Sequence, residues 1–300
     1  MAVIDRLIAL RYGISDDTVL NPEPGAPSHA GPPDPERLGD VLLKLRAQAA
    51  ATGADGLNYA AMAHSESHSV YRRYLAELRS FDPKILVGRE RRLAFWVNLY
   101  NGIVLDAVVQ WKVRRTVREV PGFFWRAAYD IGGLRYSAND IENGILRANR
   151  PHPAIPGAPF GRSDPRRMFS MDRIDPRIHF ALVCASRSCP PIASYEAGRI
   201  DPQLDLAARA FIRGGGVQVD AVEGQVHLSR IFQWYAADFG ARSQAIGDRR
   251  PLLRFIATYL HPTDAKLVLA RRQWTVSFMS YDWSLNGLWP GEEADAPGRG

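Results

Sequence analysis

The stretch RERRLAFWVNLYNGIVLDAVVQWKV, residues 89–113, is apolar on nearly every side when it is drawn as a helix. It is long enough for about six turns, and a helix that is hydrophobic all round is covered on several sides. We therefore expect it to be the buried central helix of the domain.

Two amides, Asn98 and Asn101, lie three residues apart on one face of this helix. A buried amide without a partner costs on the order of 1 to 3 kcal/mol, so both must bond to backbone, to each other or to polar groups of a site. We expect Asn98 and Asn101 either to tie the helix to a neighbouring loop or to orient a catalytic group.

The chain before the central helix divides into a linker and two helices. Residues 21–35 are rich in Pro and Gly and poor in apolar side chains, which is typical of a linker. Apolar spacing predicts helices at about 36–51 and through HSVYRRYLAELRSFDP, with Ser65 as a candidate cap. We expect an N-terminal segment and linker at 1–35, a single domain at 36–290 and a disordered tail at 291–300.

The chain after the central helix mixes short helices with short strands. The predicted elements are a hairpin around Gly132 and Gly133, a short helix in SANDIENGILRANR, a strand at 177–184, helices near 201–213, 229–239 and 250–260, and strands in VQVDA, QVHLS, LVLA and TVSFMSYDW. Strands that arrive as neighbours after a helical half favour an α+β fold over a regular βαβ series.

Charge and composition limit the classes of partner. The chain has 38 basic and 32 acidic residues, a formal net charge of +6, and its basic residues are mostly dispersed arginines. Phosphate binding depends on clustered Lys and Arg, so no nucleic-acid partner is expected. Asp5, Arg6 and Arg11 interrupt the early apolar stretch, and we expect no later segment to reach membrane-spanning length, so we expect a cytoplasmic protein. No cofactor is indicated, and the expected partner is a small molecule or peptide.

Both cysteines lie in IHFALVCASRSCPPI, residues 178–192. If 177–184 is a strand, His179 and Cys184 face opposite sides, whereas a polar turn can bring Cys189 back toward the histidine. Spacing therefore favours Cys189 as the partner of His179. The thiolate is the nucleophile, and a neighbour such as an imidazolium or Arg187 has to favour it, because a free thiol has a pKa of about 8.5.

Other interpretations of this stretch stay open. Cys184 can be a small buried hydrophobe and His179 a core histidine. The cysteines and His179 supply at most three metal ligands at an unusual spacing, and a close pair can also form a transient disulfide. In DIENGILR, Glu142 either pairs with Arg147 as a structural ion pair or orients His179.

Four blocks of the chain, taken in order, resemble a known family. They are RLAFWVNLYNGIVLDAVV, SANDIENGILR, DPRIHFALVCASRSCPPI and SYDWSLNG, and they are similar to the uncharacterised DUF547 family over about residues 55–287. The resemblance implies a fold distantly like the papain and transglutaminase superfamily, with a long central helix packed on an antiparallel sheet. In that superfamily a cysteine at the start of the helix pairs with a strand histidine, whose position His179 fits. The start of the helix here, GRERRLAFW, has neither Cys nor Ser, and Asn143 stands where the family often has a histidine.

Two functions are expected from these observations. The first is a cysteine-dependent hydrolase or acyl transferase acting on an amide, ester or thioester, with a histidine base and a carboxylate or amide that orients it. Its candidate catalytic residues are Cys189, Cys184, His179, Glu142, Asn98 and Asn101. The second is a catalytically silent binding or scaffold protein that uses an aromatic-rich surface around residues 123–125 and 283–289.

Overall fold

The structure is a computed structural model that describes residues 11–15, 18–23, 33–49, 56–241, 249–271 and 273–290. Most of the predicted linker and all of the predicted tail at 291–300 lie outside these ranges. The helices are α2 (Arg37–Ala49), α3 (Tyr59–Ala63), α4 (Glu66–Glu77), α5 (Arg89–Gln110), α6 (Phe123–Arg126), α7 (Ile200–Phe211), α8 (Arg230–Trp234), α9 (Arg250–Ala257) and α10 (Pro262–Ala270). The strands are β1 (Leu57–Asn58), β2 (Ala128–Ile131), β3 (Leu134–Ser137), β4 (Val217–Asp220), β5 (Gln225–Leu228), β6 (Thr275–Phe278) and β7 (Gly287–Leu288).

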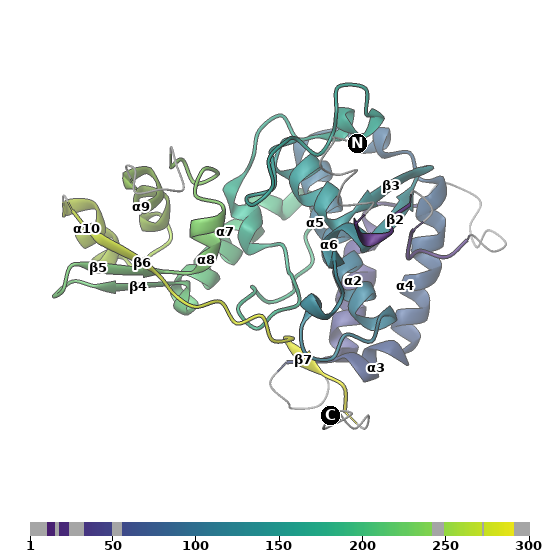
Figure 1. The fold of residues 1–300 in the computed structure, drawn as a ribbon, viewed down its shortest axis with the longest axis horizontal. Coiled ribbons are helices and arrows are strands. Elements are labelled where there is room, and N and C mark those ends of the chain that lie inside the picture. The colour runs from purple at the N-terminus through teal and green to yellow at the C-terminus, as the bar shows by residue number, and fades with distance from the viewer. Residues whose placement is uncertain are drawn as a thin grey trace.

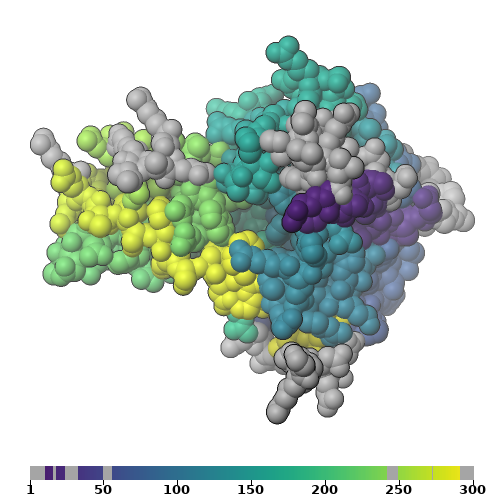
Figure 2. All heavy atoms as spheres, viewed as in Figure 1, coloured from purple at the N-terminus to yellow at the C-terminus, as the bar shows by residue number. Residues whose placement is uncertain are grey.

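The molecule has a larger and a smaller lobe (Figures 1 and 2). The larger lobe holds α2 to α6, β1 to β3 and β7, and its buried cluster includes Trp96 of α5. The smaller lobe holds α8 to α10 and β4 to β6, with a separate cluster around Phe232 and Ile256. Helix α7 joins them, since Leu204 packs in the first cluster and Ala208 in the second. After β6 the chain crosses back to the larger lobe, where it ends in β7 (Figure 1).

The predicted central helix is confirmed as α5. Every residue from Leu93 to Val109 is buried, and the helix packs against α2, α3, α7 and the π-helical turn Asp140–Leu146. By length and composition α5 could cross a membrane, contrary to our expectation that no segment would qualify. Nearly all of it is enclosed by the fold, so its place in the core accounts for its apolar composition.

Several local predictions around α5 are confirmed. Ser65 caps α4, because its hydroxyl accepts a hydrogen bond from the His68 backbone N–H at 3.1 Å. The hairpin of β2 and β3 turns at Gly132 and Gly133, whose φ angles of 61° and 78° lie in the left-handed region that favours glycine.

The described strands form three small sheets. Strand β1 pairs with β7 in parallel, β2 pairs with β3 antiparallel, and β5 lies between an antiparallel β4 and a parallel β6. The α+β class is confirmed. The single antiparallel sheet expected beneath the central helix is not formed by these strands, and helices cover most of α5 instead.

Two stretches predicted as strands are not strands. Of residues 177–184, the first four lie in the 3-10 helix Pro176–Phe180, which starts where the Asp175 carboxylate accepts from the Arg177 N–H, and the last four form a turn and a loop. The LVLA segment lies in α10, which begins with Pro262. In both cases a start signal with Pro in the first turn outweighed the β-branched and apolar content. The argument that placed His179 on one face of a strand therefore does not apply.

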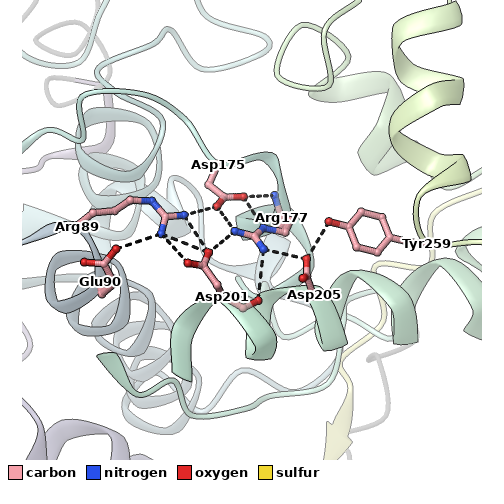
Figure 3. Close-up of polar contacts among 7 residues, drawn as sticks. All are labelled: Arg89, Glu90, Asp175, Arg177, Asp201, Asp205 and Tyr259. Carbon is pink, nitrogen blue, oxygen red and sulfur yellow. Dashed lines mark hydrogen bonds and ion pairs between the residues drawn. The ribbon is translucent and has the colours of Figure 1, made fainter. Parts of the chain in front are cut away.

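An ion-pair network holds this 3-10 helix against its neighbours (Figure 3). Arg177 donates to Asp175 at 2.6 Å and to Asp205 of α7 at 2.8 Å, and Arg89 of α5 donates to Asp175 at 2.6 Å. Burial opposes ionisation of Asp175, but its hydrogen bonds with Arg177 outweigh burial and lower its pKa. Tyr259 of the smaller lobe donates to Asp205 at 3.0 Å. The network fixes the segment that carries the candidate histidine to both lobes.

Candidate functional site

A cavity of about 350 Å³ lies between the two lobes. The larger lobe contributes α5, the π-helical turn and the loop that carries both cysteines, and the smaller lobe contributes α8. Tyr281 and Trp283, in the segment that crosses back from β6, also line the cavity. A mostly apolar cavity with a few convergent polar groups is the usual form of a small-molecule site.

Four of the six candidate residues line this cavity: His179, Glu142, Cys184 and Cys189. The other two, Asn98 and Asn101, are buried in α5 behind it. The structure therefore brings the histidine, the carboxylate and both sulfurs to one space, although they come from segments far apart in the sequence.

His179 is held by a buried carboxylate that the sequence did not point to. Its Nε2 lies 3.0 Å from Oδ2 of Asp238, and the same oxygen accepts a hydrogen bond from Nε of Arg147 at 2.6 Å. Arg150 donates to the other oxygen at 2.9 Å. Burial opposes ionisation of Asp238, but its bonds with His179 and Arg147 outweigh burial and hold its pKa well below the usual range. Asp238 is therefore ionised and accepts only, so Nε2 of His179 carries the proton.

The imidazole of His179 is neutral. Burial lowers its pKa, and the nearby Asp238 opposes this effect without overcoming it. The ring stacks on Tyr235, with the two centroids 3.9 Å apart, which fixes its orientation. With the proton on Nε2, the basic nitrogen is Nδ1, which makes no hydrogen bond to any residue that the structure describes. An imidazole held in this way can accept a proton at Nδ1.

Arg147 directly follows the π-helical turn, and polar side chains of that turn orient its guanidinium. One of its terminal nitrogens donates to Oδ1 of Asn143 at 2.6 Å, and Nδ2 of Asn143 donates to Oδ1 of Asn139 at 3.0 Å. The amide of Asn143 thus supports the guanidinium that neutralises Asp238.

Glu142 lies on the cavity wall between two tyrosines. The Tyr235 hydroxyl donates to its Oε1 at 2.5 Å, and the Tyr100 hydroxyl donates to its Oε2 at 3.2 Å. Burial, with the charge of Glu142, raises the pKa of both phenols well above 10, so both remain donors. The predicted ion pair between Glu142 and Arg147 is not formed. In the π-helical turn the five-residue spacing joins their backbones, with the Arg147 N–H 2.8 Å from the Glu142 carbonyl, while the guanidinium bonds to Asp238.

The two cysteines form a disulfide, with their Cα atoms 6.2 Å apart. The polar turn does bring Cys189 back, but to Cys184 and not to His179, and no hydrogen bond joins either sulfur to that histidine in the described part of the chain. The backbone N–H of Cys184 donates to Sγ of Cys189 at 2.9 Å. The Tyr281 hydroxyl lies 3.1 Å from Sγ of Cys184 and 3.4 Å from Sγ of Cys189.

The cysteine loop is fastened on two sides. Asn101 donates to the Ala181 carbonyl at 3.0 Å and accepts from the Val183 N–H at 3.0 Å. On the other side, the Arg187 N–H donates to the Ser284 carbonyl at 2.8 Å. The amide of Asn101 therefore ties the central helix to the loop, which is one of the two roles expected for it.

Asn98 makes the same kind of tie to another loop. It donates to the Tyr195 carbonyl at 2.7 Å and accepts from the Tyr195 N–H at 2.9 Å. Both of its polar atoms are thereby paired with backbone, away from the cavity.

The aromatic-rich surface expected around residues 123–125 and 283–289 is largely interior. Phe123 is 3% exposed and Trp289 is 9% exposed, and the indole N–H of Trp289 donates to the Val113 carbonyl at 2.8 Å. Trp125 and Trp283 line the cavity. These rings therefore pack inward or face the cavity between the lobes. Among the described residues, no group of three or more His, Cys, Asp or Glu side chains is placed to hold a metal ion.

A comparison with protein-family models matches residues 85–212 to DUF547, described as "Protein of unknown function, DUF547". Residues 85–212 of the chain are thus a DUF547 segment. No curated protein and no solved structure matched the chain. The matched DUF547 segment contains all six candidate residues, whereas Asp238 and Tyr281 lie beyond its end.

Three residues of this site were missed by sequence reasoning. Asp238 lies 59 residues after His179 in YAADFG, and no spacing rule connects the two. Tyr235 and Tyr281 contact the site only because the smaller lobe and the returning segment close over the larger lobe. The one signal in the sequence is the polar YDWSLN stretch, residues 281–286, which begins with Tyr281.

Proposed function

We propose that this DUF547 protein is a thiol-dependent hydrolase or acyl transferase acting on an amide, ester or thioester of a small molecule or peptide. The observation that supports the proposal is that a neutral histidine, held by a carboxylate, and both cysteine sulfurs line one cavity. The active form is the dithiol. The disulfide is its resting form, which an external dithiol reduces with two electrons and two protons.

Cys189 is the proposed nucleophile. A backbone N–H can only donate, and the N–H of Cys184 is aimed at the Cys189 sulfur at 2.9 Å. Hydrogen bonds to a charged form favour that form, so this donor favours the Cys189 thiolate. The Tyr281 hydroxyl, 3.4 Å away, is a second donor to the same sulfur.

His179 is the proposed base for the second half of the reaction. After the thiolate has attacked the acyl carbon and expelled the leaving group, an acceptor such as water has to attack the acyl-cysteine. Nδ1 of His179 takes the proton of that acceptor inside the cavity, and Asp238 stabilises the imidazolium. A likeness to the papain superfamily is proposed in these roles alone, since the nucleophile here lies on a loop and not at a helix start.

Mass spectrometry of the reduced protein tests the proposal. After incubation with an activated acyl ester, an acyl adduct is expected on Cys189, and Cys189→Ser should abolish it. Cys184→Ser is the matched control and should keep the adduct, because that cysteine is not the nucleophile. If the reduced protein gives no adduct and neither thiol is alkylated faster than free cysteine, the thiol proposal fails.

Dithiol–disulfide exchange is a second candidate, and the disulfide on the cavity wall specifically favours it. Exchange needs both sulfurs, so Cys184→Ser should abolish it as fully as Cys189→Ser. The two single variants therefore separate the candidates. A protein in which neither chemistry is found is left with the scaffold function, with a partner bound between the lobes.

A further inference from the structure

Within the described part of the chain, the carboxylate of Glu142 forms no ion pair, although it lies on the wall of a mostly apolar cavity. Its two recorded hydrogen-bond partners, Tyr100 and Tyr235, are neutral phenols, and no basic side chain among the described residues forms an ion pair with it. Burial lowers the pKa of His152 and of His179, the two histidines on the wall, so neither supplies a positive charge at neutral pH. A negative charge in such surroundings is stabilised by a cation.

Aromatic rings make up much of the remaining wall. Trp234, Tyr281 and Trp283 touch one another, with centroid separations of 4.8 to 5.7 Å. Ring faces attract cations, and the most favourable ones are weakly hydrated, as methylated ammonium groups are. The exposed Arg118 already lies over Trp283, with its guanidinium carbon 4.1 Å from the ring centroid. This ring cluster therefore accommodates positive charge at its outer edge.

We infer that the cavity binds a substrate that carries a methylated ammonium group, seated between Glu142 and the aromatic wall. This inference names the substrate class of the site and rests on the proposed function. The phenols already occupy positions on both carboxylate oxygens, so the site favours a cation that needs no N–H bonds of its own. Glu142 is then an anchor for the substrate and does not orient the base.

Choline and its neutral isostere 3,3-dimethylbutan-1-ol are the probes that test this inference. They differ in charge and hardly in shape. Titration of the unaltered protein, followed by tryptophan fluorescence, is expected to show that choline binds at least about tenfold more tightly than the alcohol. Equal affinity, or no saturable binding of choline, overturns the inference without any variant being made.

Glu142→Gln keeps the shape of the side chain and removes its charge. It should lower choline affinity by about tenfold and leave the affinity of the alcohol unchanged. Glu223→Gln is the matched control, because Glu223 is exposed and lies outside the cavity lining. It should alter neither affinity. Equal loss of choline binding in both variants would mean that only the overall charge matters, which also overturns the inference.

The same titration on Cys189→Ser separates this inference from the proposed function. Choline binding should persist there even though acylation is lost, because the anchor does not use the sulfur. Failure of choline binding with an intact acyl adduct on Cys189 would refute the substrate class alone. Binding without any adduct in the unaltered protein would refute the thiol chemistry alone.

Discussion

Replacing Asp238 by Asn tests the central electrostatic argument of the site. The side chain of Asp238 is fully buried, and its Oδ2 serves both His179 and Arg147. In the variant the side chain keeps only one oxygen. Its new NH₂ group can only donate, yet it faces the donors of His179 and Arg147. The Arg147 side chain is 5% exposed, so its charge would stay buried without a partner. Arg150 is 45% exposed and can turn to water, so it adds little to the cost.

Breaking a buried ion pair on one side costs about 3 to 5 kcal/mol. That loss is a large part of the total free energy of unfolding, which is about 5 to 15 kcal/mol for most domains. Urea unfolding, followed in parallel by tryptophan fluorescence and circular dichroism, measures it. Asp172→Asn is the matched control, since Asp172 pairs with Arg92 at 3.2 Å but is 89% exposed. The control should change the free energy of unfolding by less than about 1 kcal/mol. If both variants lose the same small amount, the reasoning about buried charge is refuted.

Three further predictions concern stability. Burial lowers the pKa of His179 below its unfolded value of about 6.5, so between the two values only the unfolded chain binds the proton. The free energy of unfolding should therefore fall as pH drops below about 6.5, and His179→Gln should flatten that slope in urea titrations at several pH values; an unchanged slope would contradict the assignment. Asn101→Ala should lower the free energy of unfolding by about 2 to 4 kcal/mol in the same assay, because two buried backbone groups lose their partner. Gln203→Ala, which removes a half-buried amide, is the control and should lower it by less than about 1 kcal/mol. A Cβ at Gly102 would overlap the Tyr71 hydroxyl, so Gly102→Ala should cost about 1 to 3 kcal/mol, and adding Tyr71→Phe should recover part of it; strict additivity in the double-mutant cycle would count against that contact.

Elements with a strong local pattern were predictable from the sequence. Helix α5 follows from an apolar run too long for a strand, and the hairpin follows from Gly132 and Gly133 between two apolar stretches. Residues 177–184 and 267–270 were assigned wrongly because composition was weighed above the start signals at Asp175 and Pro262. A capping residue and a proline act only on the first helical turn, yet they determine that both segments begin as helices.

The site itself was only partly predictable. The cysteine stretch and Glu142 could be identified from the sequence because they are chemically reactive residues surrounded by other polar residues, and both line the cavity. The partner of His179 could not be found in this way, since Asp238 reaches it only after the smaller lobe has folded against the larger one. Long-range pairing depends on tertiary packing, which no local spacing encodes.

The segment that returns from β6 to β7 has a mechanical consequence. It begins in the smaller lobe, bonds to the cysteine loop through Ser284, and is anchored in the larger lobe beside β1. A tether fixed at both ends carries tension when its anchors separate. If the two lobes move apart, this segment pulls the Tyr281 hydroxyl away from the two cysteine sulfurs. The width of the cavity and the hydrogen bonding of the sulfurs would therefore change together.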